Sequence, residues 1–132
     1  MIPDIEAIVT AHLKAELVET VTGTTPRDTR QAWVKVTQID VRNVSAPKSD
    51  HFNSFHIQLD CYASDNGPQY QGEAGDLFRS ARAAMLALPD ETLTGAVVTA
   101  VTFGSSPRIP DTSFEPPRQR YVLDTYVYAH PA

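Results

Sequence analysis

The chain has 132 residues but a single cysteine, Cys61, which excludes an intramolecular disulfide and a cysteine-based zinc cluster. No apolar run approaches the ~20 residues that a membrane-spanning helix needs, and the first residues lack the basic start and apolar stretch of a secretory signal. Basic side chains are scarce, with 11 Lys and Arg against 16 Asp and Glu. A protein that wraps nucleic acid usually has the opposite balance. We therefore expect a cytoplasmic protein whose main ligand is neither a membrane nor DNA.

Motifs for catalysis and nucleotide binding are also missing. The six glycines form no phosphate-binding loop, and there is no Gly-x-Ser-x-Gly elbow. Cys61 lies on the apolar side of a predicted strand, where a buried, unreactive thiol is expected. The chain has four isolated histidines: His12, His51, His56 and His130. We interpret His12 as a helix-boundary residue with one hydrogen-bonded nitrogen. The sequence predicts no catalytic residue, no metal site and no cofactor, and hence no enzyme.

Hydrophobic residues make up 42% of the chain, enough for one folded domain over residues 1–132. Residues 3–18 predict a helix, with Pro3 at the first helical position and an apolar stripe that includes Val9 and Leu13. Residues 73–88 predict a second helix, because their apolar positions recur at i, i+3, i+4 and i+7. Pro89 is expected to end it.

Four strands are predicted, at residues 33–41, 54–62, 96–103 and 119–129. In the first of these the apolar residues change sides at Ile39, which indicates either a bulge or partial cover on both faces. Polar loops are expected at 22–30 and 43–53, and a turn at 65–68. The order α-β-β-α-β-β predicts an α+β fold, with a four-stranded antiparallel or mixed sheet and two helices on one face. A long Pro-rich loop joins the last two strands.

That loop, residues 104–117, contains four prolines, which deny it regular structure. Fully extended, its 14 residues reach roughly 45 Å. It is either a disordered surface loop or an arm that lies across a neighbouring subunit, with Ile109 and Phe114 as anchors. On the arm interpretation, replacing both anchors with Ser weakens assembly and leaves the melting temperature of the monomer nearly unchanged.

The second face of the predicted sheet has no element left to cover it. Tyr126 and Tyr128 share this face with Val122, which suggests a contact between chains or ordinary cross-strand packing. Three arginines flank the loop: Arg108, Arg118 and Arg120. They either set the register between identical subunits through complementary charge or form a solvated face.

The end of the chain resembles a known family. Its residues read Pro107-Arg108-Ile109-Pro110-Asp111, then Pro117-Arg118-Gln119-Arg120-Tyr121-Val122-Leu123-Asp124-Thr125-Tyr126-Val127-Tyr128-Ala129-His130-Pro131. This pattern is similar to the C-terminal end of tail terminator (tail completion) proteins of long-tailed actinobacterial bacteriophages. The order of elements and the length also match that family, so the likeness spans essentially the whole chain.

The resemblance implies a structural virion protein of the tail or neck, assembled in the host cytoplasm. Such proteins form a ring, usually six-fold, at the head-proximal end of the tail tube, where they end tube polymerisation and join the head connector. The implied partners are copies of the chain itself, the tail tube protein and head–tail connector proteins, while DNA passes through the lumen without specific binding. Six subunits at −5 each carry about −30, and we expect an acidic lumen along which DNA slides.

Two alternatives remain open. The first is another neck component, such as a head-completion or head–tail joining protein. The second is a small ligand-binding or enzymatic α+β domain, with His56, Asp60 and Tyr62 lining a cleft on the uncovered face. A deep pocket with perturbed titratable groups would favour the second.

Overall fold

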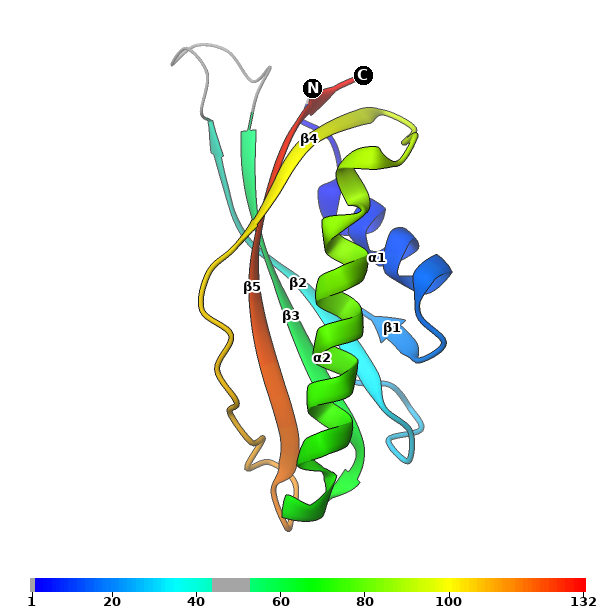
Figure 1. Ribbon diagram of the computed structural model, residues 1–132, viewed down its shortest axis with the longest axis vertical. Helices are drawn as coiled ribbons and strands as arrows, with labels where there is room; N and C mark the ends of the chain where they lie inside the picture. Colours follow the sequence, from blue (N-terminus) through cyan, green and yellow to red (C-terminus); the bar gives the residue numbers. More distant parts are fainter. Residues whose placement is uncertain (1, 44–52) are drawn as a thin grey trace.

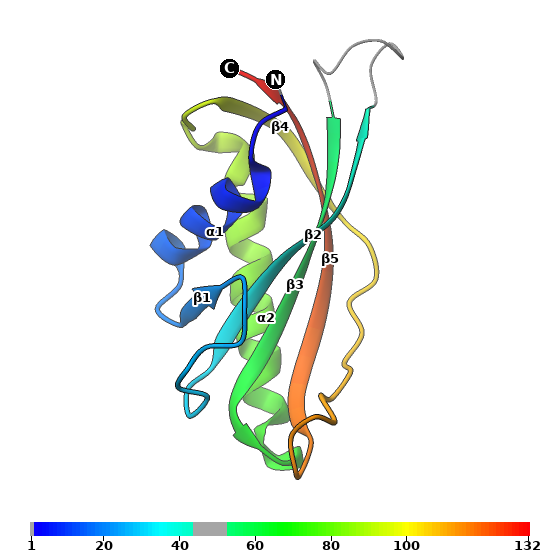
Figure 2. The ribbon, with the colours of Figure 1, turned by 180° about the vertical axis from the view of Figure 1, so that it is seen from behind.

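The computed structural model describes residues 2–43 and 53–132. The elements are, in chain order, α1 (Ile5–Glu16), β1 (Thr20–Thr22), β2 (Trp33–Asn43), β3 (Asn53–Asn66), the 3-10 helix η1 (Pro68–Tyr70), α2 (Gln71–Leu86), the 3-10 helix η2 (Leu88–Asp90), β4 (Ala96–Phe103) and β5 (Arg118–Pro131). Both α-helices lie on one face of a curled sheet, and among these described residues no helix covers the other face (Figures 1 and 2). The predicted α+β class and the placement of both helices are confirmed.

The sheet has five strands, in the order β1-β2-β3-β5-β4. β1 runs parallel to β2, and the remaining pairs are antiparallel, so the sheet is mixed. The four-stranded prediction is therefore wrong in its count. The missed strand, β1, has only three residues, too few for an alternating pattern to stand out from the loop that follows it.

The ends of the two helices differ from the predicted bounds. Asp4 is the N-cap of α1, and its Oδ1 accepts a hydrogen bond from the Ala7 N–H at 3.1 Å. Pro3 thus lies before the cap and not at the first helical position. α2 ends at Leu86, and the turn that contains Pro89 is the separate 3-10 helix η2. Residues 44–52 of the predicted loop at 43–53 lie outside the described residues.

A β-bulge explains the change of sides in β2. The register with β3 shifts between Gln38 and Asp40, and Ile39 is left half exposed. Val36 before the bulge pairs with Leu59, and Val41 after it pairs with Phe55, so both sides of the bulge return apolar residues to the helix-covered face. Of the two explanations considered for this strand, the bulge is confirmed.

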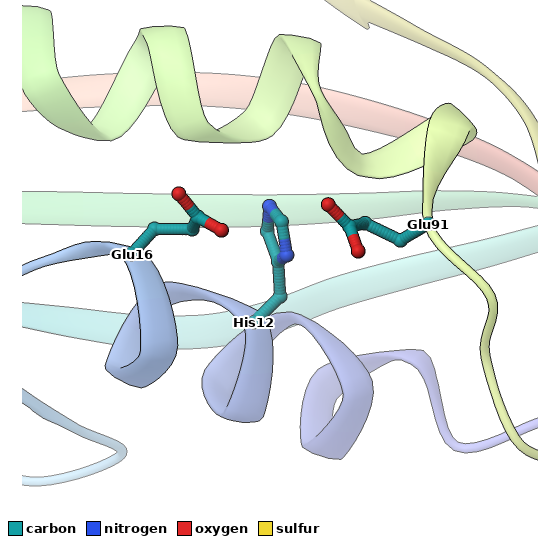
Figure 3. A group of neighbouring side chains, drawn as sticks. All are labelled: His12, Glu16 and Glu91. Carbon is teal, nitrogen blue, oxygen red and sulfur yellow. The ribbon is translucent and has the colours of Figure 1, made fainter.

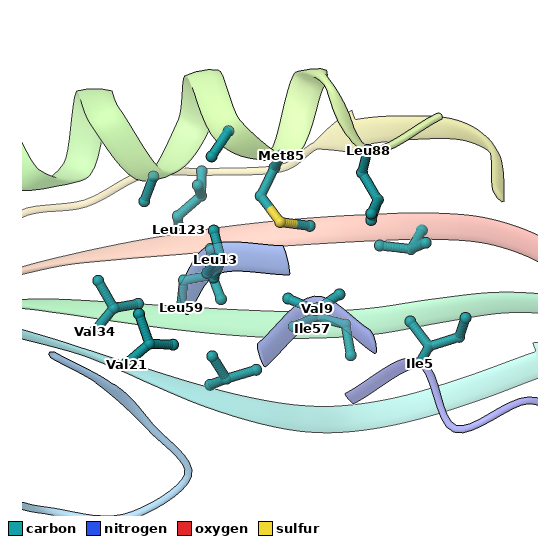
Figure 4. Packing of buried hydrophobic residues seen from close by; sticks show 14 of the residues in the cluster. Ile5, Val9, Leu13, Val21, Val34, Ile57, Leu59, Met85, Leu88 and Leu123 are labelled. Carbon is teal, nitrogen blue, oxygen red and sulfur yellow. The ribbon is translucent and has the colours of Figure 1, made fainter. Parts of the chain in front are cut away.

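The core fills the space between the helices and the covered face of the sheet (Figure 4). Its fully buried members include Val9 and Leu13 from α1, Met85 from α2, and Leu59 and Leu123 from the sheet. Each such side chain contributes about 1.5–3 kcal/mol through burial. The core therefore occupies the helix-covered face of the sheet, and the side chains on the opposite face are available for contacts outside this core.

Residues 104–117 lack regular structure, as their prolines predict, but they lie along β5 of their own domain (Figures 1 and 2). The Ile109 N–H donates to the Arg120 carbonyl at 2.9 Å, and the Val122 N–H donates to the Pro107 carbonyl at 3.0 Å. These bonds continue the edge that β4 occupies farther along β5. In this structure the segment is therefore neither a free loop nor an arm extended away from the domain.

Candidate functional site

The uncovered face of the sheet is built from β2, β3 and β5. Because directly paired residues point to the same side, the register brings the outward side chains into rows across the strands. One row runs from Asp40 to His56 to Tyr126, and the next from Arg42 to Ser54 to Tyr128. The predicted placement of the two tyrosines on this face is confirmed, and each is partly exposed.

His56 is at the centre of this face. Its Nε2 lies 3.0 Å from Asp124 Oδ1, and its ring stacks on Tyr126 with the centroids 4.6 Å apart. A neighbouring ion pair joins Arg42 Nε to Asp40 Oδ2 at 3.2 Å. The residues of the two rows line a hollow of about 350 Å³. The hollow combines two aromatic rings with charges of both signs, which suits a protein contact.

Val122 does not extend the tyrosine row into solvent. It pairs with Asp60 on the same face, but both side chains are buried. The 104–117 segment lies beside Val122, whose N–H is bound to the Pro107 carbonyl. The expected row of three exposed apolar side chains is thus corrected to the pair Tyr126 and Tyr128.

A second cluster holds the end of the 104–117 segment against the domain. Trp33 stacks on Tyr62 with centroids 4.2 Å apart, and the Phe114 ring lies 6.2 Å from Trp33. The Arg118 guanidinium lies 5.0 Å from the Trp33 ring centroid and 4.6 Å from that of Phe114. Arg118 is 4% exposed, and it also donates to Asn66 Oδ1 and to the Thr29 carbonyl.

Two of the interface candidates lie in this cluster. Phe114 packs against Trp33 and Arg118 of its own chain and is partly exposed, and its contact with a neighbour stays a prediction. Arg118 is buried, and this desolvation lowers the pKa of its guanidinium. A buried arginine stacked between aromatic rings does not present its charge to another subunit. The sequence showed the arginine and the aromatics but not their proximity, since Trp33 and Phe114 are far apart along the chain.

Arg120 also binds the segment. Its Nε donates to the Ile109 carbonyl at 2.9 Å, and its Nη1 lies 3.4 Å from the Tyr62 hydroxyl. That hydroxyl donates to Asp111 Oδ2 at 3.0 Å. Desolvation is the main cause that raises the pKa of Tyr62 to about 12. Burial alone would raise the pKa of Asp111, but hydrogen bonds from Ser113 and Tyr62 outweigh it and keep that pKa below its usual value.

Two of the remaining candidates point outward. Ile109 is 45% exposed, and Arg108 is exposed apart from a hydrogen bond from its Nη1 to Gln119 Oε1 at 3.0 Å. Phe114, Arg120, Tyr126 and Tyr128 are partly exposed, so Arg118 is the one buried residue among the interface candidates. Their contact with another subunit stays a prediction.

The alternative cleft is only partly assembled. Of its three predicted residues, His56 alone lines the hollow on the uncovered face. Asp60 is buried and accepts from Gln58 Nε2 at 3.0 Å, and Tyr62 is bound to Asp111. Cys61 lies in the core on the other face, and burial raises the pKa of its thiol.

A group of possible metal ligands lies on the helix side. His12 and Glu16 from α1 and Glu91 from the turn after η2 bring one ring nitrogen and two carboxylate oxygens within 4.8 Å of one another (Figure 3). The expectation that no histidine belongs to a ligand set overlooked the i, i+4 spacing of His12 and Glu16, which places both on one helix side. The approach of Glu91 depends on the packing of α1 against α2 and had no signal in the sequence.

No protein-family model matches the chain, and no curated protein matches it. In residues 2–43 and 53–132, no helix is long and apolar enough to cross a membrane. The function has to be inferred from the surfaces described above and from the resemblance of the C-terminal residues.

Proposed function

We propose that this chain is a structural, non-catalytic virion protein that forms a ring at the head-proximal end of a phage tail tube. There it ends tube polymerisation and provides the joining surface for the head connector. The observation that carries the proposal is the sheet face without helical cover, on which His56, Tyr126 and Tyr128 gather beside charges of both signs. The likeness of residues 107–131 to tail terminators supplies the setting.

The character of this face supports a contact with a protein. Partly buried tyrosines offer a large apolar ring and a polar tip, and they are enriched in interfaces. The ion pair between Arg42 and Asp40 supplies opposite charges that can fix the orientation of a partner, and His56 adds a polar ring held 3.0 Å from Asp124 Oδ1. We assign the face to self-assembly, in which it contacts a different part of the surface of a neighbouring copy of the chain.

The two edges of the sheet support a ring over a symmetric dimer. One edge of the sheet is β4. At the opposite edge β1 pairs with only three residues of β2, so the rest of β2 is an open edge. Each open edge presents backbone hydrogen-bonding groups and a half-exposed apolar side chain, Val97 on β4 and Ile39 on β2. Because the edges differ, a contact between them is heterologous, and repeated heterologous contacts form a ring when the rotation between neighbours closes.

The docked segment fits the same proposal. Its internal contacts through Phe114, Arg118 and Arg120 hold it on β5, which leaves Arg108 and Ile109 on its outer side. A segment fixed in this way presents its side chains with little loss of conformational entropy on binding. We propose that these two residues contact a neighbouring subunit, the tail tube protein or the head–tail connector.

Substitution of the tyrosines tests self-assembly. Tyr126→Asp with Tyr128→Asp places two carboxylates on the uncovered face and should leave the protein monomeric by light scattering. Val18→Asp is the matched control, because Val18 is almost fully exposed in the connection between α1 and β1. We expect rings with a central hole from the wild type and the control in electron micrographs. Assembly of the double variant at the wild-type level would contradict the proposal.

Particles assembled without the protein test its position. Loss of a tail terminator is expected to leave tubes of abnormal length. Tailless, leaking heads would instead identify a head-completion protein, which is the alternative position in the neck.

A further inference from the structure

We propose that His12, Glu16 and Glu91 form a binding site for a divalent transition-metal ion, with Zn²⁺ as the ion that fits best. The site lies on the helix side of the molecule, away from the surface assigned to assembly, and it goes beyond the proposed function. The bound ion would link α1 to the chain segment that leaves α2. The inference stands on the histidine's hydrogen bond, the charges around it and the spacing of the three donor atoms.

The hydrogen bond of His12 decides which ring nitrogen is available. Its Nε2 lies 2.7 Å from the carbonyl oxygen of Ala84 in the last turn of α2. A carbonyl only accepts, so Nε2 carries the proton and Nδ1 of the neutral ring keeps its lone pair. A metal-binding histidine characteristically donates its second N–H to a carbonyl or carboxylate, which fixes the orientation of the ring. His12 is 7% exposed, so packing holds the ring in this orientation as well.

The charges around His12 favour a cation. Figure 3 shows its ring between the carboxylates of Glu16 and Glu91. In the described part of the chain neither carboxylate is in an ion pair with Lys or Arg. The last turn of α2 contains no basic residue, although the partial negative charge of a helix C-terminus lies there. Two carboxylates, a nitrogen lone pair and a helix C-terminus therefore converge with no positive group among them.

The spacing of the donor atoms is within reach of a metal ion. One ring nitrogen of His12 and one oxygen of each carboxylate lie within 4.8 Å of one another, and bonds of about 2.0–2.2 Å to a tetrahedral ion would bring neighbouring ligands to about 3.3–3.6 Å. Both glutamates are exposed, so their side chains can rotate inward while His12 stays fixed. An adjoining surface hollow of about 440 Å³, which His12 and Glu91 help to line, leaves room for a water as fourth ligand.

The donor set selects the class of ion. An imidazole nitrogen and carboxylate oxygens are both ligands that Zn²⁺ accepts, and imidazole suits the neighbouring ions of the first transition row. Mg²⁺ and Ca²⁺ prefer all-oxygen sites, and the only cysteine lies in the core. The three ligands come from both sides of the α1–α2 contact. An ion that binds this arrangement and not the unfolded chain raises the stability of the fold.

Titration of the purified protein tests the site. The protein is used without a histidine tag, treated with a chelator and desalted, and then titrated with ZnCl₂ in a calorimeter. We expect one Zn²⁺ per chain with micromolar or tighter affinity, and a rise in melting temperature when Zn²⁺ is present. Glu16→Gln and Glu91→Gln should each weaken binding by about tenfold or more and abolish that rise. Asp90→Asn, an exposed neighbour of Glu91 outside the cluster, should bind as the wild type does.

Co²⁺ provides a second readout that does not depend on stability. Its visible absorption should intensify on binding to a site of low coordination number, and the two glutamine variants should lose this change. Circular dichroism of the apo variants checks that each is folded. Absence of Zn²⁺ binding by the wild type would overturn the proposal. Binding that survives the combined Glu16→Gln and Glu91→Gln substitutions would also overturn it, because the ion would then lie on other residues.

Discussion

The contact between Phe114 and Trp33 makes the docking of the 104–117 segment measurable. Trp33 is the only tryptophan of the chain, and it is fully buried. Tyr62 stacks on it, while Phe114 and Arg118 lie against it from the segment and the start of β5. Its fluorescence therefore reports on whether the segment is docked. The informative perturbation is Phe114→Ala, which removes the aromatic ring and leaves the backbone hydrogen bonds to β5 in place.

The expected cost follows from the burial of Phe114. Truncation of a fully buried Phe costs about 3–5 kcal/mol, and Phe114 is only partly buried, so about half of that applies. The contact of its ring with the Arg118 guanidinium adds about 0.5–1 kcal/mol. We expect the free energy of unfolding to fall by about 2–3.5 kcal/mol. Ile109→Ala is the matched control in the same segment, and its exposed side chain should cost no more than about 0.5 kcal/mol.

The assay is urea denaturation followed by Trp33 emission, together with acrylamide quenching of the native protein. Phe114→Ala should lower the denaturation midpoint, shift the native emission to longer wavelength and increase quenching. Ile109→Ala should change none of the three. Because Phe114 packs against Trp33 and Arg118, we now expect the replacement of Ile109 and Phe114 with Ser to lower the melting temperature of the monomer as well. Unchanged stability and quenching in Phe114→Ala would refute the docking of the segment on Trp33.

Three further predictions concern titratable groups. The pKa of Tyr62 is raised from 10.0 to about 12, so its contribution to stability is present below pH 10 and is lost as the pH rises through about 12. The absorbance of the Tyr62 phenolate should therefore appear near pH 12, and Tyr62→Phe should remove it. The pKa of Asp111 is lowered, so its contribution is present above the usual value of 3.8 and is lost as the pH falls below it. Asp111→Asn should therefore be less stable than the wild type at neutral pH, and urea titrations should show the difference shrinking in acid. The buried Cys61 thiol should react with a thiol reagent only when the protein unfolds, and rapid reaction of the native protein would contradict its position in the core.

The sequence predicted those elements whose side chains alternate or recur with a regular period. The two helices, the four longer strands and the side of β5 on which Tyr126 and Tyr128 lie all leave such a pattern. The change of sides at Ile39 was visible too, although only the structure distinguished a bulge from cover on both faces. β1 was missed because three residues carry no period.

The contacts that the sequence did not predict are made by the backbone or by residues distant in the chain. Hydrogen bonds between residues 104–117 and β5 involve main-chain atoms, which have no side-chain signature. The burial of Arg118 depends on Trp33 and Phe114, and neither lies next to it in sequence. In the metal-ligand group, the spacing of His12 and Glu16 was readable, but the approach of Glu91 requires the packed helices.

The most direct test of the central claim, that this protein completes its packing with copies of itself, is the mass and shape of the purified protein in solution. Light scattering across a range of concentrations is combined with electron microscopy of the same samples. The account predicts closed rings with a central hole and a mass of about 87 kDa for six chains of 14.5 kDa. Particles of 14.5 kDa at every concentration, and also in the presence of tail tubes, would contradict it.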